Sequence, residues 1–306
     1  MIVVKLMDGL GNQMFQYAFG RYLQTVYNEP IVFETTKLQE GAVRRLGIQQ
    51  FNIPLVDRKK LSKDTCAMPS KLENKFLMLF SKAVRVICEK LLGISMSGEK
   101  AYHKMIKLGF YTTTDSILYH DFKKTKAPIK FVRGYFQSEK YFAPIRDIIK
   151  KEFVLKREYS GEKLDFINEL NNCASVCVHI RRGDYVGNKR FEVCTEEYYQ
   201  KAIDYIKKNV ENPVFYIFSN TKEDLEWIKN NYSLPEDARY VDIGDDEFDD
   251  LCFMYNCHHF IISNSTFSWW GSYLSKFEGI TISPDRWMPD DFSEDIFLKE
   301  WTKISF

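Results

Sequence analysis

The carboxyl half of the chain alternates between two hydrophobic periodicities, and this alternation is the feature that most limits its fold. Short apolar runs typical of buried strands occupy residues 175–180, 214–218, 239–243, 259–263 and 279–282. Amphipathic helical patterns separate them, over residues 196–208, 222–231, 249–256 and 266–275. Strands alternating with helices at this spacing predict right-handed βαβ units, and therefore a parallel sheet with helices on both faces.

The amino half begins in the same way, with a predicted strand, a tight loop and a helix at residues 2–6, 8–12 and 13–27. Further strands are predicted at 30–34 and 130–133 and helices at 71–92 and 138–152, while 37–70 has no clear pattern. A chain of 306 residues exceeds one comfortable core, and the polar stretch 156–163 is the best boundary. We therefore predict an α/β protein with two Rossmann-like domains, 1–157 and 158–306, facing each other across a cleft. The C-terminal tail is expected to pack back on the first domain.

Two arginines follow the strand predicted at residues 175–180. In open α/β sheets, ligands bind beyond the carboxyl ends of the strands. The planar guanidinium group matches phosphate geometry and keeps its charge at working pH. Arg181 and Arg182 are therefore predicted to hold an anionic ligand such as a nucleotide. The alternative is a surface arginine pair held by Asp184.

A second candidate anion site follows the strand predicted at residues 259–263. Ser265, Thr266, Phe267 and Ser268 stand where a helix begins, and a serine or threonine there caps the helix. The same first turn offers backbone N–H groups and hydroxyls at the positive end of the helix dipole. If Arg181 ends a neighbouring strand, a diphosphate would be held from two sides.

His179 directly precedes the two arginines of the first candidate site. Its ring could donate a hydrogen bond to a phosphate or ribose oxygen. The alternative is a core histidine whose hydrogen bonds are satisfied inside the sheet.

The loop that carries Gly9 and Gly11 lies between a predicted strand and a predicted helix, which suits close backbone approach to a ligand. It is not a P-loop, because lysine and serine or threonine are absent after the glycines. It is not a dinucleotide fingerprint either, because Met14 stands where the third glycine belongs. A nicotinamide-dependent oxidoreductase is therefore disfavoured.

An acidic run over residues 242–250 ends in Asp249 and Asp250 at the start of a predicted helix. Acidic residues there favour the helix dipole without any function. One of these carboxylates could also accept two hydrogens from a guanine edge, and the run could alternatively bind Mg²⁺ or Mn²⁺. A solvated turn is the simplest interpretation of the run.

Composition narrows the functional classes. The formal net charge is +1, from 43 basic and 42 acidic residues, which argues against a nucleic-acid binder. The seven cysteines contain no C-x-x-C pair, so neither a disulfide framework nor a zinc site is indicated. No signal peptide or spanning stretch is evident, and a cytoplasmic protein is predicted.

The predicted helix 71–92, with lysines among apolar residues, could rest on the inner face of a membrane. Packing onto its own domain is the favoured alternative.

Four blocks of the sequence carry a family resemblance. His179, Arg181, Arg182 and Asp184 match the H-x-R-R-x-D signature of α1,2- and α1,6-fucosyltransferases. Residues 9–17, 134–138 and 263–270 resemble blocks of glycosyltransferase family 11, the α1,2-fucosyltransferases. The blocks occur in order over nearly the whole chain, which is most similar to the bacterial members.

This resemblance implies a GT-B fold and GDP-fucose as the donor, bound by the carboxyl-terminal domain. It implies an inverting transfer, without metal or cofactor, to the 2-hydroxyl of a galactose-terminated oligosaccharide or lipid-linked glycan, as in polysaccharide or O-antigen synthesis. Arg181 would contact the β-phosphate and residues 265–268 the same diphosphate. Asp250 would read guanine, and Asn12, in the acceptor-side domain, would face the fucosyl and acceptor groups.

Arg182 is expected to position the loop by pairing with Asp184. The general base stays open among Asp8, Asp184 and Glu192. The glutamate that α1,6 enzymes carry beyond the motif is replaced here by Lys189. Two other functions compete: a metal-dependent nucleotide-sugar transferase that uses the run 242–250, and a non-catalytic nucleotide-sugar-binding protein.

Overall fold

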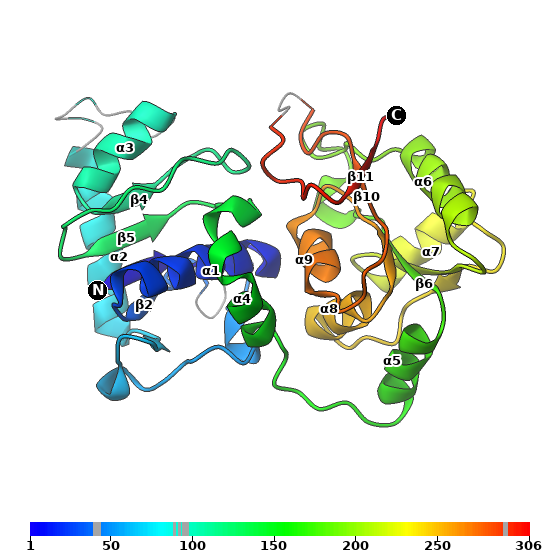
Figure 1. Cartoon of the computed structure of the whole chain (residues 1–306), viewed down its shortest axis with the longest axis horizontal. Helices are drawn as coiled ribbons and strands as arrows, with labels where there is room; N and C mark the ends of the chain where they lie inside the picture. Colours follow the sequence, from blue (N-terminus) through cyan, green and yellow to red (C-terminus); the bar gives the residue numbers. More distant parts are fainter. Residues whose placement is uncertain (39–43, 88–89, 91–92, 94–97, 290–292) are drawn as a thin grey trace. The chain divides into compact units, whose positions relative to one another are not determined.

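In the computed structural model, the chain divides into two compact units, Met1–Lys156 and Arg157–Phe306. The sequence placed this boundary between residues 157 and 158. The structure describes residues 1–38, 44–87, 90, 93, 98–289 and 293–306, and Figure 1 shows their arrangement within each unit. In the described ranges, no helix combines the length and the apolar character needed to cross a membrane.

The first unit contains a five-stranded parallel sheet in the order β3-β2-β1-β5-β4. Its strands are β1 (Ile2–Lys5), β2 (Ile31–Glu34), β3 (Cys66–Ala67), β4 (Phe110–Thr112) and β5 (Lys130–Arg133). Its helices are α1 (Leu10–Tyr27), α2 (Lys71–Val86), α3 (Glu99–Lys107) and α4 (Arg146–Glu152).

Alternate residues of β1 face different helices, because successive side chains of a strand point to opposite faces of a sheet. Val4 lies under α1, where a side chain at Gly20 would collide with it, so the glycine lets the helix approach closely. Val3 packs with Val32 and with Leu77 of α2. Helices α1 and α2 therefore cover opposite faces of the first sheet.

Several predictions for the first unit need correction. The helix predicted at 138–152 is two 3₁₀ turns, Glu139–Tyr141 and Ala143–Ile145, followed by α4. Pro144 explains the break, because proline has no N–H and its ring clashes with the preceding turn of a helix. Helix α1 begins at Leu10, so Gly11 and Asn12 belong to its first turn and not to a loop. Elements α3, β4 and β3 were missed, and the end of the helix predicted at 71–92 lies partly outside the described residues.

The second unit contains a six-stranded parallel sheet in the order β11-β10-β9-β6-β7-β8. Its strands are β6 (Ser175–His179), β7 (Val214–Phe218), β8 (Arg239–Tyr240), β9 (His259–Ile261), β10 (Thr281–Pro284) and β11 (Thr302–Ile304). If the six strands are renumbered along the chain with β6 as the first, their order is that of the nucleotide-binding Rossmann fold. The order reverses between β6 and β9.

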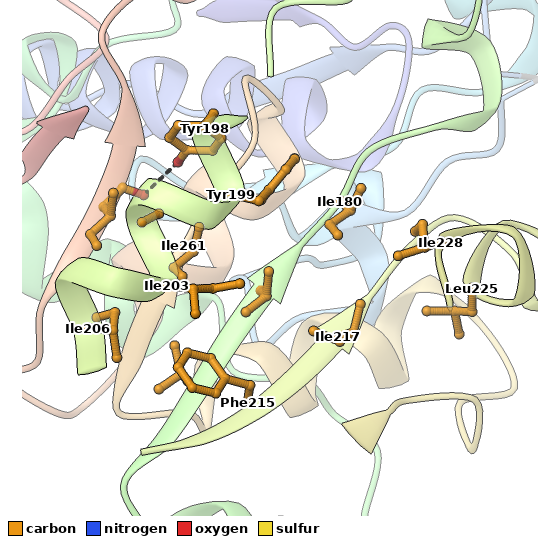
Figure 2. Close-up of a cluster of buried hydrophobic side chains, with 14 residues drawn as sticks. Ile180, Tyr198, Tyr199, Ile203, Ile206, Phe215, Ile217, Leu225, Ile228 and Ile261 are labelled. Atoms are coloured by element: carbon orange, nitrogen blue, oxygen red, sulfur yellow. Dashed lines mark hydrogen bonds between the residues drawn. The ribbon is translucent and has the colours of Figure 1, made fainter. Parts of the chain in front are cut away.

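Helices cover both faces of this second sheet. They are α5 (Glu162–Asn172), α6 (Glu196–Asn209), α7 (Lys222–Asn231), α8 (Glu247–Tyr255) and α9 (Thr266–Leu274). Figure 2 shows the apolar cluster between the sheet and helices α6 and α7, where the Tyr198 hydroxyl donates to the Ile282 carbonyl at 3.2 Å. On the other face, the centre of the Phe166 ring of α5 lies 5.1 Å from the ring centre of Phe253 of α8 and 5.6 Å from that of Tyr216 of β7.

The α/β class and two Rossmann-like units are confirmed, while the cleft between them remains a prediction. The expected packing of the C-terminal tail on the first domain stays a prediction, while the second unit gives the tail a place in its sheet. Its strand β11 pairs with β10, with Lys303 opposite Ser283, so the tail completes the second sheet. Helix α5 was not predicted, and β8 and β9 are shorter than expected.

Candidate active site

The two candidate anion-binding motifs meet where the strand order of the second sheet reverses. Strands β6 and β9 are parallel neighbours, with Val178 opposite Ile261, so the segments that follow them leave the sheet at the same edge. The His179 Nδ1 and the Ser263 hydroxyl lie 2.9 Å apart and join the two strand ends. Ligands of open α/β sheets bind at such an edge, beyond the carboxyl ends of the strands.

Arg181 extends from β6 into a short 3₁₀ turn, Gly183–Tyr185. Its Nη2 donates to Asp184 Oδ1 at 2.5 Å, and its guanidinium carbon lies 5.2 Å from the ring centre of Tyr185. The Tyr185 hydroxyl in turn donates to the Asn264 carbonyl at 3.2 Å, which links Arg181 to the start of α9. The Arg181 Nε is buried and has no acceptor in the described part of the chain. A buried donor without a protein partner is available to a ligand.

The expected pairing of Arg182 with Asp184 is wrong. Arg182 Nε instead donates to Asp224 Oδ1 at 3.3 Å, and its guanidinium carbon stacks 3.3 Å above the Trp227 ring. Its backbone N–H donates to Asn220 Oδ1 at 3.0 Å. The two consecutive arginines therefore have different partners: Arg182 is held against α7, and Asp184 is taken by Arg181. A role of Arg182 in donor binding stays a prediction.

At the start of α9 the two serine hydroxyls have partners within the protein, whereas two backbone N–H groups do not. The Ser265 hydroxyl accepts from the Phe267 N–H at 3.3 Å and caps the helix. Ser268 is buried, and its hydroxyl donates to the Ser265 carbonyl at 3.1 Å. The N–H groups of Thr266 and Ser268 have no acceptor among the residues that the structure describes. Such unpaired amides at a helix N-terminus are candidates for binding an anion.

His179 is only 2% exposed. Burial, with a smaller contribution from Arg181, lowers its pKa to about 3. The ring is therefore neutral at physiological pH; it shares a hydrogen bond with Ser263, and its centre lies 6.1 Å from that of the Phe267 ring. Its predicted contact with the donor stays a prediction.

Asp249 is the exception to the expected solvated acidic turn, because it is fully buried while Asp242 and residues 245–247 are exposed. Its Oδ2 lies 2.5 Å from Lys163 Nζ, and its Oδ1 accepts from Arg157. Burial by itself raises the pKa of Asp249, but hydrogen bonds from Lys163, the Asp245 N–H and Arg157 outweigh it and hold that pKa below its usual value. A signal for this cluster was present in the polar stretch 156–163, because that stretch carries both cations. Over the described ranges, no group of His, Cys, Asp or Glu side chains is placed to hold a metal ion.

The neighbouring Asp250 has the opposite electrostatics. Burial and the nearby carboxylates of Asp249, Asp246 and Glu247 raise its pKa to about 7. Its Oδ1 lies so near Gly244 that a Cβ there would approach it to 2.6 Å, so a glycine is required for this carboxyl to keep its position. Sequence reasoning missed Gly244. A carboxyl that titrates near neutrality at the carboxyl edge of a Rossmann sheet is a candidate ligand-binding group.

The first unit gathers its own candidates where its strand order reverses, between β1 and β5. The Tyr135 hydroxyl donates to Asp8 Oδ2 at 2.7 Å, and Gln137 Nε2 donates to Asn12 Oδ1 at 2.7 Å. Asp8 has a left-handed backbone with φ of 65°, a strained conformation that is more frequent at functional sites. At Gly9, which precedes α1, a Cβ would meet nothing within 4 Å, so the space before the helix is open.

The three candidate bases lie in different surroundings. Asp8 belongs to the first unit, Asp184 is paired with Arg181, and Glu192 Oε1 accepts from the Gly187 N–H at 2.8 Å. A general base has to reach the acceptor hydroxyl directly or through one water. Since none of these contacts selects one carboxylate, all three remain candidates.

The family model for glycosyl transferase family 11 matches residues 1–305. The chain belongs to glycosyltransferase family 11. It is similar to the alpha-1,2-colitosyltransferase of Escherichia coli, with 30% identity over 99% of this chain and 98% of that protein. It is 28% identical to the O-antigen biosynthesis glycosyltransferase WbnK of Escherichia coli, over 98% of this chain and 99% of that one.

Human galactoside alpha-(1,2)-fucosyltransferase 1 is 27% identical over 60% of this chain and 55% of its own length. Among solved structures, the fucosyltransferase NodZ from Bradyrhizobium has a TM-score of 0.49 and 11% identity, over 90% of this chain and 93% of that one. The family 11 resemblance seen in the sequence is therefore confirmed, and the protein is a glycosyltransferase.

Proposed function

We propose that this family 11 enzyme is a galactoside α1,2-fucosyltransferase. It transfers L-fucose from GDP-fucose, with inversion and without a metal, to the 2-hydroxyl of a galactose-terminated oligosaccharide or lipid-linked glycan. The observation that carries the proposal is the buried Nε of Arg181, which has no acceptor among the described residues. Arg181 follows strand β6, and α9, with its unpaired amides, follows the neighbouring strand β9 at the same edge of the sheet. The names of the colitosyl and fucosyl relatives support the same class of donor.

The chemistry of the transfer explains why such donors are needed. Breaking the bond between sugar and phosphate gives the sugar oxocarbenium character while negative charge grows on the departing diphosphate. Groups that bind this growing charge stabilise the transition state more than the ground state, and so they raise the rate. Arg181 and the amides of Thr266 and Ser268 are held by the fold before the reaction, so they need no reorganisation during it.

The other site residues take supporting roles in this proposal. Asp250 would accept two hydrogen bonds from the guanine edge, at the start of α8. Asn12, oriented by Gln137, would contact the fucosyl and acceptor groups. Asp8, Asp184 or Glu192 would receive the proton of the acceptor hydroxyl.

A transfer assay tests the proposal. We expect the purified protein to release GDP when GDP-fucose and a galactose-terminated oligosaccharide are both present, and NMR of the product to show an α1,2 linkage. Activity is expected to persist in EDTA. Loss of activity in EDTA with recovery on adding Mn²⁺ would favour a metal-dependent transferase.

GDP-colitose is the informative second donor, because colitose is fucose without its 3-hydroxyl and one relative is a colitosyltransferase. A clear preference for it would correct the donor and leave the site intact.

The affinity for GDP is expected to depend on the charge of Asp250. Below its pKa of about 7 this carboxyl carries a proton and loses an acceptor for guanine. The dissociation constant should therefore increase as pH falls from 8 to 6, by up to about tenfold per pH unit below the pKa. Isothermal titration calorimetry measures it.

Asp250→Asn is the matched control for this pH dependence. Titration of the β-phosphate is common to both proteins and cancels when their dissociation constants are compared at each pH. His179 does not interfere, because its pKa of about 3 lies far below this range. If the dissociation constant of the Asn variant changes with pH in the same way as that of the unaltered protein, Asp250 does not recognise guanine.

A further inference from the structure

Helix α2 turns apolar side chains to solvent and polar side chains toward the sheet. Leu72, Phe76 and Leu79 are 80%, 64% and 52% exposed, whereas Asn74 and Ser81 are only 4% and 6% exposed. A helix that merely covers a sheet has the reverse pattern, with its leucines inside and its polar residues outside. The outward apolar side chains of α2 therefore call for a partner other than the core.

The orientation of α2 is fixed by its inner face. Asn74 Oδ1 accepts from the Thr35 N–H at 2.9 Å, and Asn74 Nδ2 donates to Thr35 Oγ1 at 3.0 Å. Leu77, on the same side, packs with Val3 and Val32 of the sheet. Rotating the helix to bury its outer leucines would break these contacts.

The outer apolar residues form one continuous stripe. Leu72, Phe76, Leu79 and Val86 follow each other at intervals of three, four or seven residues, which places them on one side of an α-helix. The stripe continues into Ile87, which is 45% exposed. An exposed apolar patch of this kind on a soluble unit marks an interaction surface.

Positive charge lines one flank of the stripe. Lys71, Lys75 and Lys82 are exposed and share one side of the helix, because they are spaced by four and seven residues. The only acidic residue of the helix, Glu73, is already paired with Arg58 at 3.0 Å. We call this set the α2 surface: the stripe Leu72, Phe76, Leu79 and Val86, with the flank Lys71, Lys75 and Lys82.

A second cationic segment adjoins the α2 surface. The Arg58–Glu73 pair ties the 3₁₀ turn Arg58–Lys60 to the first turn of α2, and Lys59 and Lys60 of that turn are exposed. The cations therefore extend past the start of the helix.

We propose that the α2 surface docks the enzyme on an anionic lipid bilayer, with the helix lying in the plane of the interface. The stripe would enter the boundary between headgroups and acyl chains, and the lysines would contact anionic headgroups, as in other interfacial helices. A second copy of the chain is a poorer partner, because an antiparallel contact would bring lysine rows together with no free acid on the helix. A nucleic acid would use the lysines and leave the stripe exposed.

Vesicle co-sedimentation tests this proposal with the full chain and without any substrate, so its outcome is independent of the proposed transferase activity. We expect binding to phosphatidylcholine vesicles that contain phosphatidylglycerol, and weak or no binding to phosphatidylcholine alone. Leu72→Gln/Phe76→Gln/Leu79→Gln and Lys71→Gln/Lys75→Gln/Lys82→Gln should each reduce binding by about tenfold or more.

Two control variants match these changes elsewhere on the surface. Lys201→Gln/Lys207→Gln/Lys208→Gln on α6 removes the same charge, and Val154→Gln/Leu164→Gln replaces other exposed apolar residues. Both should bind like the unaltered protein. Thermal midpoints and activity on a soluble acceptor, which should be retained in all variants, report intact folding.

Three results would overturn the proposal. The unaltered protein could fail to sediment with anionic vesicles, or the stripe variant could bind them as well as the unaltered protein. A dimer in solution that the stripe variant abolishes would assign the α2 surface to a second copy of the chain.

Discussion

Replacing Arg181 by Lys is expected to reduce kcat by about 100-fold or more, the scale seen when one donor to a developing oxyanion is removed. Lysine keeps the positive charge but loses the planar fork, including the buried Nε that has no acceptor among the described residues. The smaller head group would also weaken the contacts that Arg181 makes with Asp184 and the Tyr185 ring. GDP release measured at saturating donor and acceptor gives kcat directly.

Arg182→Lys is the matched comparison, because it makes the same chemical change one residue away. Arg182 is held by Asp224 and Trp227, so its loss should loosen the loop and affect turnover by less than about tenfold. The ratio of the two effects is the decisive quantity. Near-normal turnover in Arg181→Lys, or a larger loss in Arg182→Lys, would show that Arg181 is not the main stabiliser of the leaving group.

Asp249→Ala is expected to lower the free energy of unfolding of the second unit by about 3 kcal/mol or more, as is typical when one partner of a buried ion pair is removed. The carboxylate is fully buried and is shared by Arg157 and Lys163, while it also accepts from the Asp245 N–H at 3.0 Å. Its removal leaves Arg157 and Lys163 with their more exposed partners Asp246 and Asp245, and takes away the acceptor of the Asp245 N–H. Because α8 also carries Asp250, GDP affinity should fall with stability.

Asp245→Ala provides the control, because Asp245 contacts the same Lys163 but its side chain is 84% exposed. Exposed ion pairs contribute little, so its effect should stay below about 1 kcal/mol. Urea unfolding followed by tryptophan fluorescence measures both variants. Equal midpoints for Asp249→Ala and the unaltered protein would mean that the cluster does not stabilise the unit.

The same cluster gives an expected response to acid. The pKa of Asp249 is lowered in the folded protein, so its contribution to stability is present above the unfolded pKa and is lost as pH falls through the folded value. The difference in stability between the unaltered protein and Asp249→Ala should therefore shrink below about pH 4.

Much of the site was predictable because its residues follow directly on regular elements. Strand β6 places Arg181 at the sheet edge, and Ser265 caps α9, as their local patterns indicated. Local sequence could not reveal side-chain partners distant along the chain. Arg182 pairs with Asp224 and not with Asp184, and Asp249 pairs with two cations from the stretch assigned to the domain boundary. Such partners depend on how helices pack over the sheet.

The sequence by itself determined the alternation of strands and helices, the family and the motifs that lie at strand ends, because these follow from hydrophobic period and from short residue patterns. Only the tertiary structure decided which strands are neighbours. Pairing β6 with β9 brings Arg181 and α9 to one edge, and pairing β10 with β11 keeps the C-terminal tail in the second sheet. The physical reason is that strand order depends on long-range hydrogen bonding and on burial of both sheet faces, to which residues far apart in the chain contribute together.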